Sequence, residues 1–287
     1  MLEHLTAFEL ECKGKNLRPK TIEFYTWQLG QFRAWLVSQD ITRIEDVQKA
    51  TIQRYLVYQK ERGLKDRSVH ASFRAIRAFF NFLESDEWIT QNPVKRLKGP
   101  RIDHVPIKGY SEVEIAKLLA GCRHLRDRCI IHVLLDTLCR ASELISLNIS
   151  DLDIRQQVVY VRRAKNRKAR QVILSTKSCK LLLKYLHTRE PYAEDDPLFV
   201  SLTTGRRLTY QGLAMIFKSL ADRTGIKTSI HHTRRSGALI MYNHGCDLAT
   251  LRALLDHADY KQVQTYLAIS NEQVIRTAKK HAVMDCL

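Results

Sequence analysis

Side chains suited to chemistry on a phosphate group recur through the second half of the chain. Six of them are Arg140, Lys165, His231, Arg234, His257 and Tyr266. Guanidinium groups stay charged and present paired donors to phosphate oxygens, which suits a transition state with added negative charge. A tyrosine oxygen attacks phosphorus only with help, because a phenol pKa of about 10 keeps it protonated at neutral pH. The set predicts covalent catalysis on a phosphodiester.

The order and spacing of these residues are a more specific signal than their types alone. Arg140 begins Arg-Ala-Ser-Glu-Leu after an apolar run, and a His-x-x-Arg motif follows at 231–234. Tyr266 comes nine positions after His257. This pattern resembles the tyrosine recombinase (lambda-integrase-like) family, and is closest to its two-domain Xer-type members over essentially the whole chain. That family breaks and rejoins DNA through a phosphotyrosine.

The resemblance implies a role for each residue. Arg140 and Arg234 would bind the phosphate, Lys165 would give a proton to the departing 5′ oxygen, and Tyr266 would be the nucleophile. The two histidines would complete the site, with Glu143 as a supporting partner. We expect no cofactor and no metal, because the arginines would do the work of Mg²⁺ and the phosphotyrosine bond would store the energy for rejoining.

Two registers of the His-x-x-Arg motif fit the segment 231–235. Arg234 lies 23 positions before His257, as in Xer-type members, whereas Arg235 lies 22 positions before it. We therefore assign His231 and Arg234 to the site and keep Arg235 as a candidate DNA contact.

The lysine assignment rests on the basic segment 162–170. Counting back from Arg170 to the family's Gly-Lys-Gly-Asn-Lys-x-Arg pattern selects Lys165, with Lys168 as the second candidate. Alanine and asparagine replace the two turn glycines, and one extra residue must be absorbed, for example by a bulge. The alternative is a hairpin that binds DNA phosphates without supplying a catalytic lysine. Candidate DNA contacts here are Arg163, Arg167 and Lys168.

Two further positions near the C-terminus remain open. Tyr260 lies only three positions after His257, so it is a second tyrosine to test beside Tyr266. Asp256 stands where the family usually has glycine, and its carboxylate could pair with a nearby cation or perturb His257. The tail after Tyr266 has a one-faced apolar pattern, which resembles the helix that family members exchange between subunits; the alternative is a helix that docks on its own domain.

Apolar residues at three- and four-residue steps predict helices through residues 1–97. The helix over 66–84 has a second side with basic residues at helical spacing, which could lie along DNA or form a solvated charged face. Its candidate DNA contacts are Arg67, Arg74 and Arg77. The resemblance implies that residues 1–97 are a four-helix, SAM-like domain that binds core DNA.

Residues 98–110 hold prolines, glycines and basic side chains with little periodicity, which is typical of a linker. Ser111 opens a capping-box pattern and so begins the domain 111–287. β-Branched runs at 158–162 and 171–174 predict a hairpin among helices. The predicted fold class is mainly α, with the second domain a mixed α/β catalytic domain of helices and a small antiparallel sheet.

The formal charge of +17 indicates a polyanionic partner, with nucleic acid ahead of a membrane surface. Seven scattered cysteines favour neither disulfides nor a zinc site, and no signal peptide or membrane-length apolar run is present. These features predict a cytoplasmic, nucleoid-associated protein. The chain begins almost directly with the helical domain, so we expect no further arm-binding domain.

We interpret the chain as a site-specific DNA recombinase acting on double-stranded DNA as a homotetramer. The resemblance implies a 3′-phosphotyrosine and a Holliday junction, in Xer-like dimer resolution or in a resolvase or integrase of a transposon. An accessory recombinase or a DNA-bending protein is a further expected partner. The alternatives are a type IB topoisomerase, which relaxes any DNA, and a catalytically inactive DNA-binding regulator.

Overall fold

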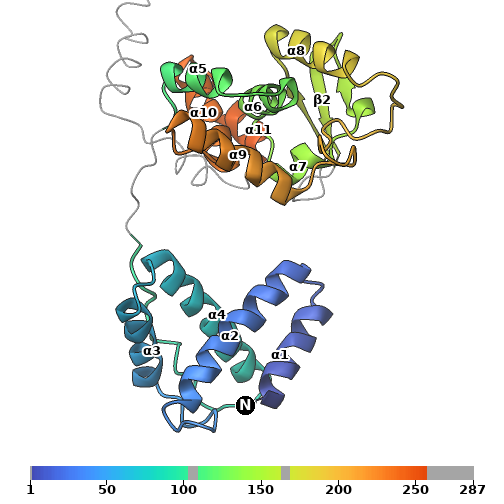
Figure 1. Ribbon diagram of the computed structural model, residues 1–287. Helices are drawn as coiled ribbons and strands as arrows, with labels where there is room; N and C mark the ends of the chain where they lie inside the picture. Colours follow the sequence, from blue (N-terminus) through green and yellow to red (C-terminus); the bar gives the residue numbers. More distant parts are fainter. Residues whose placement is uncertain (1, 103–108, 163–168, 257–287) are drawn as a thin grey trace, which may run out of the picture. The chain divides into compact units, whose positions relative to one another are not determined.

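The computed structural model describes residues 2–102, 109–162 and 169–256, and the chain divides into two compact units, Met1–Val105 and Pro106–Leu287. Helices dominate both units, and a small antiparallel sheet lies in the second (Figure 1). The predicted fold class is therefore confirmed. None of the helices in these ranges has both the length and the apolar character that crossing a bilayer requires.

Over its described residues, 2–102, the first unit is a bundle of four helices. They are α1 (Leu2–Gly14), α2 (Pro19–Val37), α3 (Lys49–Glu61) and α4 (Asp66–Ser85). The apolar face predicted for α4 is buried, with Phe73, Ile76 and Phe80 at most 2% exposed. Because residues three and four apart share one side of a helix, the basic residues of α4 fall on the opposite, exposed side.

A hydrogen-bonded polar group is buried inside this bundle. The Ser72 hydroxyl donates to Gln28 Oε1 at 2.6 Å, and Gln59 Nε2 donates to Ser72 Oγ and to the Tyr55 hydroxyl, both at 2.9 Å. Buried polar groups must be paired to avoid a desolvation penalty, so the network fixes how α2, α3 and α4 pack.

The second unit places helices around a three-stranded sheet. The helices are α5 (Glu112–Ala120), α6 (Leu125–Thr137), α7 (Ala141–Ser146), α8 (Thr176–His187), α9 (Tyr210–Thr224), α10 (Ile230–Asn243) and α11 (Leu248–Leu255), with the 3₁₀ turn η1 (Ile149–Asp151). The strands are β1 (Leu152–Asp153), β2 (Val158–Val161) and β3 (Arg170–Ile173). The predicted hairpin is β2–β3, whereas β1, only two residues long, was not predicted.

Helix α6 is the centre of this unit, with α10 and α8 packed against it (Figure 1). Gly237 lets α10 approach closely, because a Cβ there would lie 2.4 Å from the carbonyl oxygen of Leu135 in α6. Helix α6 leads into Arg140 and α10 carries Arg234, so this contact sets the distance between the two arginine-bearing segments.

A buried carboxylate joins α7 to the sheet. Glu143 is fully buried, and Arg170 of β3 donates to both of its oxygens, at 3.1 and 2.8 Å. Arg140 Nη1 also donates to Glu143 Oε1, at 2.9 Å. Burial raises the pKa of Glu143, but the hydrogen bonds from Arg170 and Arg140 outweigh it and lower the pKa to about 2.

Gly237→Ala should lower the free energy of unfolding of the second unit by about 1–3 kcal/mol, because the new methyl group meets a backbone carbonyl that cannot rotate away. Urea denaturation measures the change. Gly30→Ala is the matched control in α2, where a Cβ meets no atom within 4 Å. The free energy of unfolding of that variant should rise by up to about 1 kcal/mol, because alanine has a higher helix propensity than glycine. An unchanged midpoint for Gly237→Ala would show that α10 can shift without cost.

Glu143→Gln should destabilise the second unit by about 3–5 kcal/mol near pH 7, because two arginines lose their buried counter-charge. The folded pKa of Glu143 lies below its ordinary value of 4.5, so this contribution is complete above pH 4.5 and is lost as pH falls towards 2. Denaturation curves should be measured at several pH values. The difference in the free energy of unfolding between native protein and variant should become smaller as the pH falls over that range. Glu112→Gln, an exposed change of the same charge, should show no such narrowing.

Candidate active site

Arg140 is placed by a sharp change of direction after α6. Leu138 takes the left-handed conformation, with φ 52°, and ends α6 two residues before Arg140. Arg140 then caps the start of α7, where its backbone N–H donates to Glu143 Oε2 at 2.8 Å. The Arg-x-Ser-Glu-Leu pattern therefore has a local structural cause: its glutamate fixes both the backbone and the side chain of its arginine.

The C-terminal end of α11 accepts hydrogen bonds from three arginines. The carbonyl of Leu254 accepts from Arg170 Nε at 3.2 Å, and that of Leu255 accepts from Arg234 Nη2 at 2.5 Å. The carbonyl of Asp256 accepts from Arg140 Nη2 at 2.9 Å. The last carbonyls of a helix lack intrahelical partners and carry the negative end of its dipole, so they suit cations.

Arg140 and Arg234 line one cavity of about 210 Å³ together with His231. Arg234 is only 2% exposed, and Arg140 is partly buried. The remaining lining residues are Cys139, Ala141, Tyr210 and Ile230. Apolar walls around paired guanidinium groups strengthen their attraction for an anion, because little water screens them. The paired positive charges of this cavity suit an anionic group.

His231 and His232 face different surroundings. His231 lines the cavity, whereas the His232 ring packs against the Tyr110 ring, with centroids 4.1 Å apart. Burial lowers the pKa of His231, and the positive charge of Arg234 lowers it further, so the ring is neutral at pH 7. A neutral imidazole can accept a proton or donate a hydrogen bond at the phosphate.

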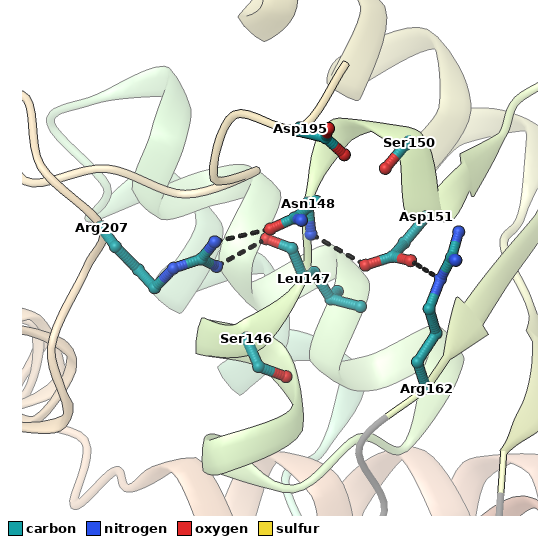
Figure 2. Close-up of a pocket in the computed structure, with 8 residues that line it drawn as sticks. All are labelled: Ser146, Leu147, Asn148, Ser150, Asp151, Arg162, Asp195 and Arg207. Atoms are coloured by element: carbon teal, nitrogen blue, oxygen red, sulfur yellow. Dashed lines mark hydrogen bonds and ion pairs between the residues drawn. The ribbon is translucent and has the colours of Figure 1, made fainter. Parts of the chain in front are cut away.

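A second cavity, of about 230 Å³, lies beside η1 and is lined by Arg162, the residue that follows β2 (Figure 2). Arg162 pairs with Asp151, whose other oxygen accepts from the backbone N–H of Asn148 at 2.9 Å. Arg207 donates to Leu147 O at 3.0 Å and to Asn148 Oδ1 at 2.5 Å. The lining carries both signs of charge, and its polar groups mainly satisfy one another. The pair between Arg162 and Asp151 therefore joins the end of β2 to η1.

The structure brings together three of the six predicted site residues, Arg140, His231 and Arg234. The other three and several candidate DNA contacts lie outside the described residues: Lys165, His257, Tyr266, Arg163, Arg167 and Lys168. On α4, Arg67, Arg74 and Arg77 are exposed, and on α10 Arg235 is buried.

Sequence reasoning did not single out Arg170 or Tyr210 as site residues. Arg170 was used only for counting, although its place in β3 brings it to Glu143. Tyr210, at the start of α9, is 57% exposed and lines the cavity. An exposed aromatic after a Thr209 cap carries no signal of its own, because its position depends on how α9 packs against α7.

Profiles of two families match the chain. The Phage integrase family profile matches residues 110–273, and the profile of the phage integrase N-terminal SAM-like domain matches residues 9–87. Among curated proteins, tyrosine recombinase XerD of Pseudomonas aeruginosa is 31% identical over 280 residues, covering 93% of this chain and 92% of that protein. Tyrosine recombinase XerC of Herpetosiphon aurantiacus is 29% identical over 285 residues, covering 96% and 92%.

Solved structures show the same fold at lower identity. The Tn1549 transposon integrase in complex with transposon right end DNA has a TM-score of 0.77 and 17% identity, covering 98% of this chain and 99% of that chain. The XerH site-specific recombinase bound to palindromic difH substrate has a TM-score of 0.76 and 20% identity, covering 98% and 85%. The chain therefore belongs to the phage integrase family and is a tyrosine site-specific recombinase.

Proposed function

We propose that Tyr266 attacks a DNA phosphodiester held by Arg140 and Arg234. The observation that carries the proposal is the shared cavity, where these arginines from two segments meet beside His231. As the tyrosine oxygen bonds to phosphorus, the bond to the 5′ oxygen breaks, which leaves a 3′-phosphotyrosine and a free 5′-hydroxyl. Rejoining reverses the step with a 5′-hydroxyl of the partner strand, so the energy of the broken bond is conserved.

The described residues supply charge stabilisation. Arg140 and Arg234 are fixed before substrate arrives by Glu143 and by the end of α11, so little reorganisation is needed when negative charge develops on phosphorus. Neutral His231 can take the tyrosine proton or hydrogen-bond a phosphate oxygen.

Lys165 and His257 complete the proposed site. Lys165 lies five positions before Arg170 in the sequence, so its segment leads directly into the strand that holds Glu143. A lysine there would protonate the departing 5′ oxygen. His257 directly follows Asp256, whose carbonyl and carboxylate both contact Arg140. Because His257 is the next residue in the chain, the contacts of Asp256 with Arg140 support a place for His257 near the phosphate.

DNA is the proposed partner of both units. We assign residues 1–97 to core-DNA binding, 98–110 to a linker and 111–287 to catalysis. Exposed arginines on α4 support the first assignment, and the DNA in the Tn1549 integrase complex supports the partner. A homotetramer with an exchanged C-terminal helix, working in the cytoplasm at the nucleoid, fits recombination between two sites. An accessory recombinase or DNA-bending protein would assist it.

Tyr266→Phe should abolish covalent attachment to DNA while leaving binding intact, because only the attacking oxygen is removed. The measurement is an SDS-resistant adduct on nicked duplexes drawn from DNA flanking the gene, with unrelated duplexes run beside them. Native protein should form the adduct on the flanking DNA alone. Tyr260→Phe is the matched control and should retain most of the adduct.

Loss of the adduct in Tyr260→Phe, with Tyr266→Phe still active, would overturn the assignment of the nucleophile. Adducts of the native protein on every duplex would indicate relaxation of arbitrary DNA, as in a type IB topoisomerase. Binding without an adduct on any duplex would indicate a regulator that has lost catalysis.

DNA affinity should fall steeply with salt, by about a thousandfold or more between 50 and 200 mM, because several phosphate contacts release counterions. Fluorescence anisotropy of a labelled duplex measures the affinity at each salt concentration, and the slope of log affinity against log salt follows from it. Arg67→Ala and Arg74→Ala on α4 should each reduce that slope by about one. Arg43→Ala, an exposed arginine paired with Glu45 between α2 and α3, is the control and should leave it unchanged. A DNA affinity that does not change with salt would contradict binding through basic side chains.

A further inference from the structure

The side chain of Asp256 contacts the arginine proposed to hold the phosphate. Its Oδ2 atom lies 2.8 Å from Arg140 Nη1, and the two side chains are 14% and 24% exposed. Asp256 follows the last residue of α11 and takes the left-handed conformation, with φ 50° and ψ 49°. The backbone at this position favours glycine, so the carboxylate is an addition that the turn itself does not need.

Arg140 already has acceptors for most of its donors. Its Nη1 atom donates to Glu143 Oε1 and Asp256 Oδ2, and its Nη2 atom donates to the carbonyls of Leu255 and Asp256. A guanidinium group has five N–H bonds, so four are engaged. A phosphate that takes two donors from Arg140 must therefore displace at least one of these acceptors.

Asp256 is the acceptor that can leave most easily. Glu143 is fully buried and held by two hydrogen bonds from Arg170, and the two carbonyls belong to the backbone. The Asp256 carboxylate is partly exposed and moves by rotation about its own side-chain bonds. Once it rotates away, Nη1 regains one N–H bond while Glu143 and the two carbonyls still orient the guanidinium group.

The charge of the site leads to the same conclusion. Three arginines, at 140, 170 and 234, lie with two carboxylates, at 143 and 256. Removing the charge of Asp256 leaves the arginines against one carboxylate and raises the attraction for an anion. Building on the phosphate-binding role proposed for Arg140, we propose that Asp256 competes with the DNA phosphate for this arginine and thereby sets how tightly the site engages DNA.

The test is equilibrium binding in the Tyr266→Phe background, where no covalent bond forms. The probe is a fluorescein-labelled duplex from the DNA flanking the gene, and anisotropy at fixed salt gives Kd for the full chain. Asp256→Asn keeps the size of the side chain and suits the left-handed backbone. It should lower Kd by about tenfold, the effect of losing one competing charge-assisted hydrogen bond. Asp256→Gly is the second variant and should act in the same direction.

Two comparisons make the result specific. Asp222→Asn, an exposed change of the same charge on α9, should shift Kd far less than Asp256→Asn. In an Arg140→Ala background the gain from Asp256→Asn should disappear, because the competition needs that arginine. Thermal unfolding of each variant confirms that it is folded.

Unchanged or weaker binding by both Asp256 variants would overturn the proposal, and weaker binding would instead make Asp256 a residue that positions Arg140. A gain that persists with Arg140→Ala would overturn it as well. Adduct formation with Tyr266 intact reports the proposed function separately. If native protein forms no adduct on any duplex, strand cleavage fails, while an Arg140-dependent change in Kd still stands.

Discussion

Like charges repel, so holding the guanidinium groups of Arg140, Arg170 and Arg234 around one small volume requires opposing charge at fixed positions. The fold supplies it in two forms. Glu143 is a full negative charge buried between α7 and β3, and the last carbonyls of α11 are partial charges that cannot move. Each arginine comes from a different segment, so these two features determine where α7, β3, α10 and α11 meet.

This arrangement orients the arginine side chains as well as offsetting their charge. A single carboxylate offsets only one of the two positive charges that it contacts. Carbonyl groups at the end of a helix add direction, because each accepts along a defined line. Arg140 and Arg170 each bond to both kinds of acceptor, and Arg234 bonds to a carbonyl with Glu143 4.0 Å away. The positive charge facing the cavity is therefore present before any phosphate arrives.

Sequence reasoning reached the parts of this site that depend on local pattern. Arg140, His231 and Arg234 were found from motif and spacing, and the helices from the three- and four-residue recurrence of apolar residues. The partner of Asp256 was left open, because it depends on an ion pair between residues 116 positions apart. Arg170 was missed because it pairs with Glu143 on another element, and Tyr210 because its place depends on how α9 packs against α7. Strand β1 was missed because two residues give no alternating pattern. Spacing also gave no sign that Arg235, like Arg234, is buried.

The buried hydrogen bonds of the first unit bear on how such proteins can be re-engineered. Gln28, Ser72, Gln59 and Tyr55 find these partners within α2, α3 and α4. A chimera that exchanges this bundle whole would carry the network with it and keep these hydrogen bonds intact. Grafting single helices would separate donors from acceptors in the interior. The whole bundle, rather than a single helix, is thus the unit to exchange between related proteins.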